Sequence, residues 1–591
     1  MILSASGWRG IFSEDGDEES RSKKISGFHA SVAEAAAALF ADFVRKKNGG
    51  RAPRIIVGLD TRPTGMAVAE QVLNALAAKD CGALFCGVTA APEIMAYARA
   101  RSKEGCADGF IYISASHNPI GYNGIKFGLV DGGVLGGADM ARLEDEFRKL
   151  TLSRDTAFAG RAENAVFAAA LKNVRRYKDQ ALAAYTGFTL ETAAGGQDAV
   201  LKELKAAINA GHAGVAADFN GSARTLSIDK GFFEDFGVKF SAINDKAGEI
   251  VHQIVPEGEA LTPCRDFLNE IRLIDKDFTL AYVPDCDGDR GNIVFFDENT
   301  ACVRPLEAQE VFALACLAGL CQLAWTGAPY VDENGGLQKT AVAVNDATSM
   351  RIDSIARAFG AKVFRAETGE ANVVNLGRRL RSEGWTAPVM GEGAAGGSIV
   401  HPSSVRDPLQ TVIALLKLLH IRSRAGKKGF FELWYERMRR EKPYSNDFTL
   451  SGIIESLPAF TTTSAYSKDA RLRIGGAGHA ALKERYQKIF SREWERQKSR
   501  LHSECGISGW EARAYNGSEE RRGVENFGEA GRGGLRIVFQ NDAGMDYASL
   551  WMRGSGTEPV FRVMADVEGV NPALHDRLLA WHRGMVLESQ S

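Results

Sequence analysis

The chain has 591 residues, of which 45% are hydrophobic and 25% are charged, and its formal net charge is −2. These values are typical of globular proteins, and the length predicts about four domains at one domain per ~150 residues. A charge near zero gives no electrostatic reason to expect nucleic acid or an anionic membrane as a partner. The nine cysteines contain no C-x-x-C pair, so they indicate neither a disulfide framework nor a zinc site.

The sequence also argues against a leader or a membrane anchor. Acidic residues occupy much of the stretch 14–19, and no window approaches ~18 uninterrupted apolar residues. We therefore expect a cytoplasmic protein that binds a small molecule.

Strands and helices alternate through the first part of the chain. Hydrophobic periodicity predicts helices over 31–46, 65–78 and 92–100, and strands that begin at 54, 81 and 109. This order is the βαβ pattern of a mostly parallel sheet. Ligand sites in such sheets lie at the carboxyl ends of the strands.

The strand 109–113 leads into a polar, turn-rich stretch, Ser114-Ala115-Ser116-His117-Asn118-Pro119, which is closed by residues 123–127. Ser116 can carry a phosphoryl group, while His117 and Lys126 can supply positive charge or move a proton. Backbone N–H groups of the turn can face an anion. The combination predicts a phosphoryl-transfer site, although a serine-containing turn by itself would be an ordinary loop.

A second unit begins near residue 175 and contains the strands 213–218 and 279–283. The latter delivers Asp285, Asp287 and Asp289 to a loop that ends at Arg290. Three carboxylates at alternate positions are hard oxygen donors that can converge on one divalent cation, and magnesium suits them. A calcium loop of the EF-hand type is excluded, because its sixth and twelfth positions would need glycine and glutamate instead of Arg290 and Phe296. A solvated acidic turn is the alternative.

The third region predicts a helix over 310–323 and strands over 341–344, 361–364 and 387–390. Two glycine-containing loops, 367–372 and 391–397, follow the last two strands. Glutamate among small neighbours can accept hydrogen bonds from sugar hydroxyls, so the predicted ligand contacts are Thr368, Gly369, Glu370 and Glu392. The alternative is a turn that needs glycine only for its backbone conformation.

The fourth region runs from about residue 443 to the end. Its charged helical stretch 480–501 and glycine-rich segment 523–534 are interpreted as an elaboration that forms solvated surface. Strands are predicted over 535–540 and 547–552. The stretch 553–559 then combines a guanidinium group, two hydroxyls and unhindered backbone N–H groups, which together favour phosphate binding. The predicted phosphate contacts are Arg553, Ser555, Gly556, Thr557 and Arg562.

These four motifs, in this order, resemble those of the alpha-D-phosphohexomutases, the family of phosphoglucomutase, phosphomannomutase and phosphoglucosamine mutase. The resemblance implies that Ser116 is phosphorylated in the resting enzyme and shares a metal ion with Asp285, Asp287 and Asp289. It also implies that Arg290 lies near the phosphoserine, and that Arg9 in the initial Gly-x-Arg-like turn faces it. Lys126 and Arg9 match the family residues that handle the proton of the sugar hydroxyl, with His117 close by. The loop 391–397 departs from the family pattern, because Ala394 and Ala395 replace a serine or asparagine.

The resemblance implies three successive mixed α/β domains around a central cleft, followed by a C-terminal α+β phosphate-binding domain. We place these domains at 1–175, 176–304, 305–442 and 443–591. The expected activity is interconversion of hexose 6-phosphate and hexose 1-phosphate, with glucose or mannose as the sugar, Mg²⁺ as cofactor and a hexose 1,6-bisphosphate as activator. The protein would be a monomer or homodimer. The alternatives are a phosphoglucosamine mutase, a non-catalytic sugar-phosphate-binding relative, or a phosphatase or kinase-like phosphotransferase.

Overall fold

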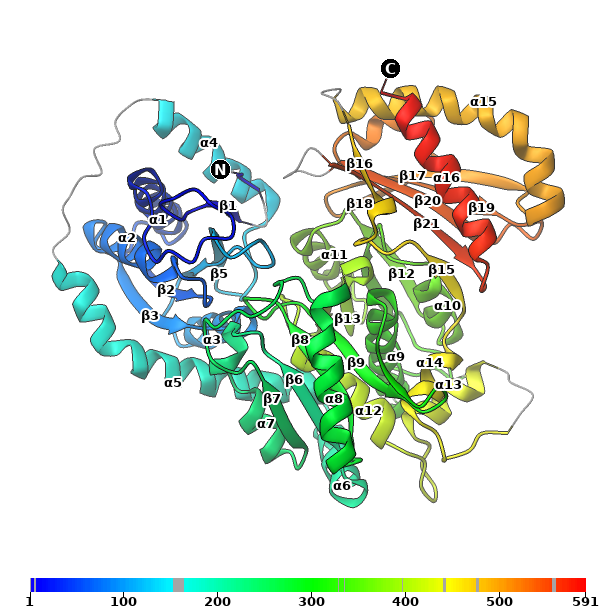
Figure 1. Ribbon diagram of the computed structural model, residues 1–591, viewed down its shortest axis with the longest axis horizontal. Coiled ribbons are helices and arrows are strands. Elements are labelled where there is room, and N and C mark those ends of the chain that lie inside the picture. Colours follow the sequence, from blue (N-terminus) through cyan, green and yellow to red (C-terminus); the bar gives the residue numbers. More distant parts are fainter. Residues whose placement is uncertain are drawn as a thin grey trace. The chain divides into compact units, whose positions relative to one another are not determined.

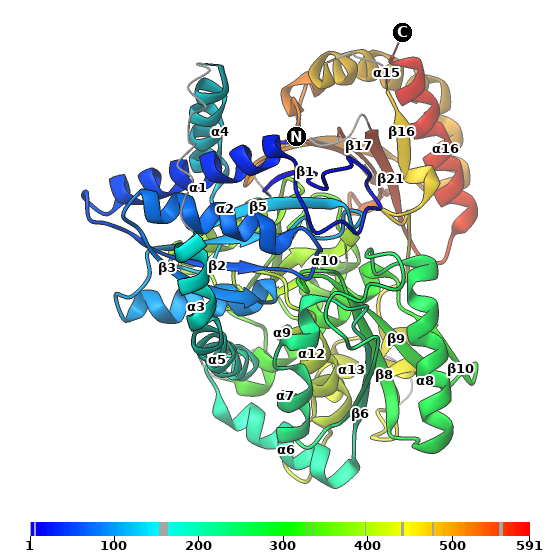
Figure 2. The same ribbon diagram turned by 60° about the vertical axis from the view of Figure 1, so that its left-hand side comes forward.

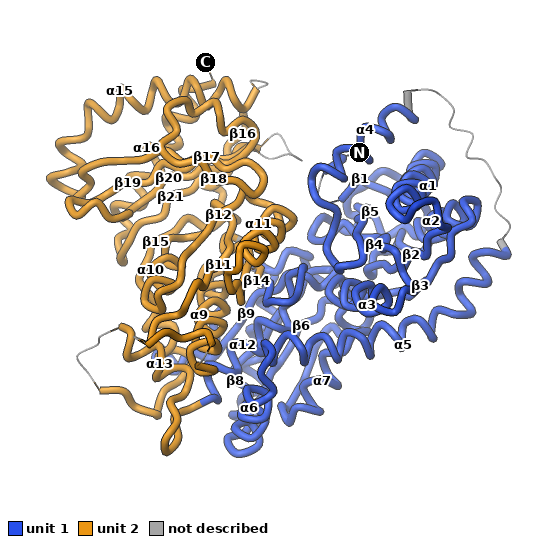
Figure 3. Tube along the Cα trace, turned by 180° about the vertical axis from the view of Figure 1, so that it is seen from behind, with its two compact units in different colours: residues 1–306, 399–421 blue, residues 307–398, 422–591 orange. Residues whose placement is uncertain are grey.

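The computed structural model describes residues 2–4, 7–152, 164–327, 329–333, 335–395, 397–438, 443–474, 478–554 and 560–590. Helices and strands in these ranges form four sheets (Figure 1). The chain divides into two compact units, residues 1–306 with 399–421 and residues 307–398 with 422–591 (Figure 3). The predicted class, a multi-domain α/β fold with a C-terminal α+β part, is confirmed. The four domain boundaries stay a prediction.

The first sheet has the strand order β1-β5-β4-β2-β3. Its strands are β1 (Trp8–Ile11), β2 (Arg54–Leu59), β3 (Gly82–Val88), β4 (Gly109–Ile113) and β5 (Tyr122–Leu129). Strand β2 pairs in parallel with β3 and β4, whereas β5 runs antiparallel to β4 and β1. Helices α1 (Gly27–Lys47) and α2 (Gly65–Ala78) cover one face, and α3 (Ala91–Lys103) and part of α5 (Asn164–Ala194) cover the other (Figures 1 and 2). Helix α4 (Gly137–Leu152) packs on α1.

Both faces of this sheet are buried, which explains why its central strands are almost wholly apolar. Ile55 and Val57 of β2 pack with α1 and α2, while Ile56 between them packs with α3. Strand β4 alternates in the same way, with Ile111 toward the first cluster and Tyr112 toward the second. The core on both sides therefore fixes the register of β4, and with it the position of the loop that follows.

The Gly-x-Arg segment, interpreted from the sequence as a turn, contributes to a strand in the structure, and the residues that close the serine loop also form a strand. Arg9 lies in β1 and Lys126 lies in β5, where Lys126 pairs with Tyr112 of β4. Gly124 of β5 serves close packing, since a Cβ there would lie 2.7 Å from the carbonyl oxygens of Ser114 and Trp8. The two charged side chains are consequently carried by rigid strands next to the serine loop.

The second sheet, order β10-β9-β8-β6-β7, repeats the arrangement of the first for the four strands β6 to β9. It differs in its edge strand, because β10 follows these strands in the chain whereas β1 precedes them. Its elements are α6 (Asp198–Gly211), β6 (Gly214–Asp218), α7 (Asp229–Asp235), β7 (Lys239–Ile243), α8 (Thr262–Ile274), β8 (Phe278–Pro284), β9 (Gly291–Asp297) and β10 (Cys302–Pro305). Strand β6 is parallel to β7 and β8, and β9 returns antiparallel to β8. Strand β8 therefore corresponds to β4.

The third sheet, order β12-β11-β13-β14, again places its third strand in sequence beside its first. Its strands are β11 (Ala341–Asn345), β12 (Lys362–Ala366), β13 (Val389–Glu392) and β14 (Gly397–Val400), and the helices around and after them are α9 (Ala308–Thr326), α10 (Arg351–Ala358), α11 (Glu370–Ser382), α12 (Pro408–His420), α13 (Phe430–Arg437) and α14 (Leu450–Ser456). The serine loop, the aspartate loop and Glu392 thus follow or end equivalent strands, β4, β8 and β13.

The fourth sheet is antiparallel, with the order β15-β21-β20-β19-β17-β18 and β16 paired to β21. Its elements are β15 (Phe460–Thr462), β16 (Arg471–Arg473), α15 (His479–Cys505), β17 (Gly509–Asn516), β18 (Glu519–Arg522), β19 (Gly534–Gln540), β20 (Asp546–Gly554), β21 (Val560–Glu568) and α16 (Pro572–Glu588). The interpretation of 480–501 and 523–534 as solvated surface is wrong for one face of each. Leu482, Tyr486, Phe490 and Phe527 are buried in the core of this sheet, because the apolar residues of α15 recur every three or four positions between its many charges.

Among the described residues, two helices, α1 and α9, have the length and apolar composition of a membrane span. In the fold, 50% of the most apolar 18-residue stretch of α1 is buried, and 72% of the corresponding stretch of α9. Core packing accounts for their composition, and the cytoplasmic location stays a prediction.

Candidate active site

The serine loop starts where β4 ends. The Ser114 hydroxyl accepts a hydrogen bond from the backbone N–H of Ser116 at 2.8 Å and donates to Asp287 Oδ2 at 2.9 Å. Ser116 has a φ of 52°, a left-handed conformation that costs a residue with a Cβ about 1–3 kcal/mol. In this conformation its hydroxyl donates to Asp285 Oδ2 at 2.9 Å. The loop therefore directs the Ser116 oxygen at the aspartate loop.

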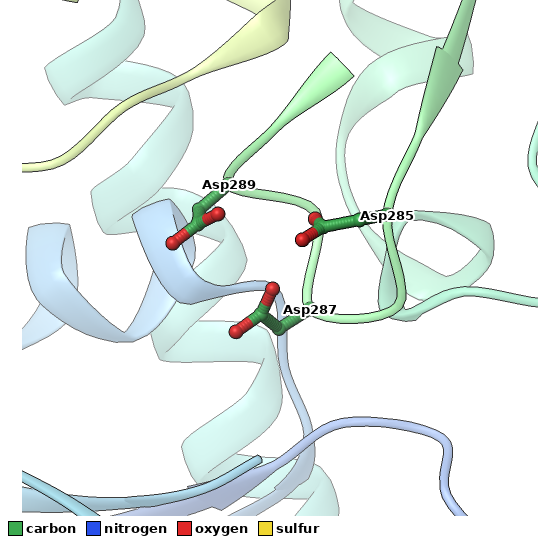
Figure 4. Close-up of side chains that lie close together, drawn as sticks. All are labelled: Asp285, Asp287 and Asp289. Carbon is green, nitrogen blue, oxygen red and sulfur yellow. The ribbon is translucent and has the colours of Figure 1, made fainter. Parts of the chain in front are cut away.

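The aspartate loop is a tight turn between β8 and β9. The N–H of Arg290 donates to Asp285 Oδ1, and the N–H of Gly288 donates to the Asp285 carbonyl at 3.1 Å. The carbonyls of Cys286 and Asp287 are held from outside by the N–H groups of Ala223 and Ala91. Figure 4 shows the three carboxyl groups turned toward one another, and one oxygen of each lies within 4.8 Å of the others.

Two cations from other elements contact the buried carboxylates. Lys126 Nζ lies 2.6 Å from Asp287 Oδ2 and 3.9 Å from Asp289 Oδ2, and Arg406 Nη2 donates to Asp289 Oδ2 at 2.9 Å. Burial raises the pKa of Asp285 well above its usual range, and the charges of its two neighbours add to the effect. Burial also opposes ionisation of Asp287, but Lys126 outweighs it and lowers the pKa of that carboxyl. Without a metal ion, the pKa values of Asp285 and Asp287 are therefore shifted in opposite directions.

A divalent cation fits this group of carboxylates. Asp287 Oδ1 and Asp289 Oδ1 are buried, and no donor among the described residues hydrogen-bonds to either atom. Buried carboxylate oxygens without partners are costly, so the fold leaves two acceptors that a cation would satisfy. The donors are all oxygens, as Mg²⁺ prefers, and the Ser116 oxygen lies next to them. We conclude that the residues present are suited to hold Mg²⁺.

His117 and Arg9 complete the surroundings of Ser116. His117 Nδ1 is 3.4 Å from Ser116 Oγ, and the positive charge of Arg290, together with burial, holds the pKa of His117 well below its usual value. Arg9 donates to Asn118 Oδ1 at 3.3 Å, and burial followed by the nearby Arg290 charge lowers its pKa to about 10. The structure therefore brings together the unit 1 residues that were predicted from the sequence, which are Ser116, His117, Lys126, Arg9, Arg290 and the three aspartates.

Sequence reasoning missed two arginines at this site. Arg406, which contacts Asp289, lies in the segment 399–421. This segment belongs to unit 1, although it follows residues 307–398 of unit 2 in the sequence. Arg62 is fully buried behind the serine loop. The only local signal for Arg62 is its place just after a buried strand, where α/β sites usually lie. Nothing in the local sequence points from Arg406 to Asp289.

Gly288 makes the aspartate loop sensitive to a single methyl group. Its φ is +70°, and a Cβ there would lie 2.5 Å from Arg224 Cδ. Arg224 cannot move aside, because it is fully buried and bonded to Asp229 at 2.7 Å and to Tyr185. We expect Gly288→Ala to destabilise unit 1 by about 2–5 kcal/mol, the sum of left-handed strain and overpacking, and to weaken Mg²⁺ binding.

Thermal unfolding followed with and without Mg²⁺ would measure both effects. Gly258→Ala is the matched control, since Gly258 also has a positive φ of +59° but nothing within 4 Å of an added Cβ. Equal stability losses in the two variants would show that the Arg224 contact does not support the loop.

A second group of predicted residues lies in unit 2. Glu392 Oε1 accepts hydrogen bonds from the Gly369 N–H at 2.8 Å and from Asn345 Nδ2 at 3.3 Å. Thr368 donates its N–H and its hydroxyl to Asp346 Oδ1, at 2.9 and 2.7 Å. The loops after β11, β12 and β13 are therefore joined by Asp346 and Glu392. Glu370 lies beside them in the first turn of α11, a helix and not the predicted loop.

Arg553 adjoins the same loops. Its Nε and Nη2 donate to Glu367 Oε1 at 3.1 and 2.9 Å, and Glu367 Oε2 accepts from the Gly517 N–H. Arg562 is the cross-strand partner of Arg553 on β21, so the structure brings these two predicted phosphate ligands side by side. Ser555, Gly556 and Thr557 lie outside the described residues. Lys483 of α15 is also buried nearby, where desolvation lowers its pKa to about 7.

Comparison with known proteins gives consistent results. Residues 2–154 match the family model described as phosphoglucomutase/phosphomannomutase, alpha/beta/alpha domain I, and residues 322–439 match that of alpha/beta/alpha domain III. A phosphoglucomutase/phosphomannomutase of Thermococcus kodakarensis is 27% identical over 391 residues, which are 66% of this chain and 72% of that protein. An Escherichia coli phosphoglucosamine mutase is 38% identical over 127 residues, 21% of this chain and 27% of that protein.

Among solved structures, a phosphoglucomutase/phosphomannomutase family protein from Burkholderia thailandensis has a TM-score of 0.60 at 17% identity. The likeness covers 100% of this chain and 97% of that one. At this identity the likeness shows a shared fold.

Proposed function

The chain belongs to the alpha-D-phosphohexomutase family, and from that premise we propose that it interconverts a hexose 6-phosphate and a hexose 1-phosphate through a phosphorylated Ser116. The observation that carries the proposal is the contact of the Ser116 hydroxyl with Asp285, inside a group of three carboxylates suited to Mg²⁺. Lys126 and Arg406 add positive charge at the same place. A hydroxyl amid metal ligands and fixed cations is what phosphoryl transfer needs.

In the proposed reaction, a free hydroxyl of the bound sugar phosphate attacks the phosphorus on Ser116. A new sugar O–P bond forms, the Ser116 Oγ–P bond breaks, and the bisphosphorylated sugar results. Its other phosphoryl group then returns to Ser116, so no net donor is consumed. Mg²⁺ bound by Asp285, Asp287, Asp289 and the serine phosphate would neutralise charge on the group in transfer.

The residues around Ser116 suit different proton-transfer roles. His117 is kept neutral by its cationic neighbours, so it can accept the proton of the attacking hydroxyl. Burial disfavours the charged form of Lys126, but Asp287 and Asp289 outweigh it and raise its pKa, so Lys126 stays a cation. We propose that Lys126 and Arg9 stabilise the negative charge that builds up on the oxygens during transfer.

Recognition of the sugar phosphate is assigned to unit 2. We propose that Glu392, with Thr368, Gly369 and Glu370, binds the sugar hydroxyls, and that Arg553, Arg562 and the stretch 555–557 bind the phosphate that does not react. The Glu392 carboxylate is held by the Gly369 N–H and by Asn345, which supports a fixed acceptor at this point. The monomeric or dimeric state and the need for a hexose 1,6-bisphosphate activator stay predictions.

Phosphoglucosamine is the second candidate substrate class. The 38% identical relative is a phosphoglucosamine mutase, and Glu370 offers a carboxylate that can pair with an ammonium group. We keep glucose or mannose as the first choice, because Ala394 and Ala395 supply no side-chain hydroxyl or amide for discrimination.

The test is incubation of the pure protein with Mg²⁺, glucose 1-phosphate and a trace of glucose 1,6-bisphosphate. We expect glucose 6-phosphate without stoichiometric release of free phosphate, and loss of activity on chelation that Mg²⁺ restores and Ca²⁺ does not. Release of free phosphate would instead show a phosphatase, and no reaction with any hexose or hexosamine phosphate would show a binding protein. A much higher kcat/KM for glucosamine 6-phosphate would establish the second candidate.

A further inference from the structure

Arg62 makes more contacts with the serine loop than any residue assigned a role so far. It follows β2, and its side chain is fully buried. Nη2 donates to the carbonyl oxygens of Ser116 and Asn118, at 2.6 and 2.5 Å. Nη1 donates to the carbonyl oxygens of Pro119 and Tyr122, the latter at 3.2 Å. One guanidinium group thus spans the loop from Ser116 to the first residue of β5.

The remaining donor of Arg62 is used as well. Nε donates to Asp60 Oδ2 at 3.2 Å, and Asp60 Oδ1 accepts the backbone N–H of Arg62 at 3.0 Å. The Asp60 N–H in turn donates to the carbonyl of Ile113, the last residue of β4. All five N–H groups of the guanidinium therefore have acceptors. The hydrogen bonds through Asp60 also tie this planar group to the ends of β2 and β4.

This arrangement solves a problem that the loop cannot solve alone. A loop without helical or strand pairing buries carbonyl groups that need donors. Here a single rigid side chain supplies donors to four of them, including that of Ser116, whose left-handed backbone is strained. Holding the Ser116 carbonyl fixes the direction of its side chain toward Asp285.

We propose that Arg62 is the positioning residue of the phosphoryl carrier: it holds the serine loop so that Ser116 Oγ stays in register with the three aspartates during transfer. Arg62 itself contacts neither substrate nor the reacting atoms. The proposal rests on the proposed function, in which Ser116 carries the phosphoryl group. It predicts that loosening the loop slows the chemical step without weakening substrate binding.

The kinetic test compares Arg62→Lys and Arg62→Ala in the full chain with Mg²⁺, hexose phosphate and bisphosphate. Misplacement of a reacting group by about 1 Å costs on the order of 100-fold, so we expect kcat to fall by roughly that factor while KM changes by less than about threefold. Guanidinium ion at millimolar concentration should restore part of the activity of Arg62→Ala. It should not rescue Ser116→Ala, which lacks the carrier itself.

Arg54→Ala is the matched control. Arg54 lies on the same strand, β2, and also donates to a loop carbonyl, that of Gly105 at 2.7 Å, but at the opposite end of the strand. Its kcat should stay at the parent value. Two results would overturn the proposal. One is an unchanged kcat per folded molecule in the Arg62 variants. The other is a loss of activity that guanidinium ion does not relieve and that equals the fraction of unfolded protein.

A second measurement does not depend on activity. Amide hydrogen exchange of peptides spanning 114–124 should be faster in Arg62→Lys than in the parent, with other peptides of unit 1 unchanged. Lysine keeps the charge beside Asp60, so this variant retains the ion pair while losing the four-carbonyl contact. Unchanged exchange in this stretch would overturn the proposal for Arg62, whether or not the parent protein is active as a mutase. An inactive parent would overturn the proposed function separately.

Discussion

Ser116→Ala is expected to lower mutase turnover by roughly 10⁴-fold or more, because it removes the oxygen that we propose as the carrier of the phosphoryl group. The fold should persist. Ser116 is buried, but among the described residues its hydroxyl hydrogen-bonds only to Asp285 and His117, and Asp285 keeps the hydrogen bond from the Arg290 N–H. Intact mass measurement should find one phosphoryl group on the purified parent protein, on the peptide containing Ser116, and none on the variant.

Substrate binding should survive in the same variant, since the predicted sugar and phosphate contacts lie on other segments. Ser31→Ala, at an exposed serine of α1 in the same unit, is the control and should keep both the phosphoryl group and the turnover of the parent. Among the described residues, Ser114 is the neighbouring hydroxyl that could take over this role. A double Ser114→Ala, Ser116→Ala variant that still turned over would end the phosphoserine hypothesis.

Asp287→Asn is expected to lower turnover by roughly 10²–10⁴-fold, because it removes the charge of one proposed metal ligand and of the carboxylate that pairs with Lys126. The protein should still fold. The change lowers repulsion among three carboxylates that lie within 4.8 Å of one another, and Lys126 keeps Asp289 at 3.9 Å. A higher Mg²⁺ concentration should be needed for half-maximal activity, which a metal titration of the initial rate would measure.

Asp297→Asn tests whether the effect is specific. Asp297 is a buried aspartate at the end of β9 in the same sheet. It pairs with the partly exposed Arg304, whereas the described hydrogen-bond partners of the Ser116 hydroxyl are Asp285 and His117. This variant should retain parent turnover and metal dependence. Full activity of the parent after exhaustive chelation would contradict the assignment of a metal to the three aspartates.

The residues nearest the proposed chemistry could be predicted because they are close in sequence. Ser116 and His117 follow one apolar strand, and the three aspartates follow another, so a strand-plus-polar-loop pattern locates them. Lys126 was predicted from the same motif. Local sequence is sufficient to predict a site residue where the order of strands in a parallel sheet determines which side chains lie at the same edge of that sheet.

The residues that were missed act through tertiary contacts. Arg62 and Arg406 are single arginines. The residues that they contact in the serine loop and the aspartate loop lie 54 or more positions away, and no spacing rule connects them. Helix α15 was misread for a different reason. Its charges outnumber the apolar residues of its buried face, so mean composition suggests surface, although Tyr486 and Phe490 are core residues.

The path of the chain through unit 1 has a consequence for biosynthesis. Residues 399–421 return to this unit only after residues 307–398 of unit 2 have been made, and they bring α12 against α5, α6 and β8. They also bring Arg406 to Asp289 and Asp407 to Arg224. On the ribosome, the first unit therefore cannot close when its first 306 residues emerge. The aspartate loop gains its contact with Arg406 late in synthesis. A nascent chain arrested before residue 406 should not yet hold the three aspartates in the arrangement of the finished protein.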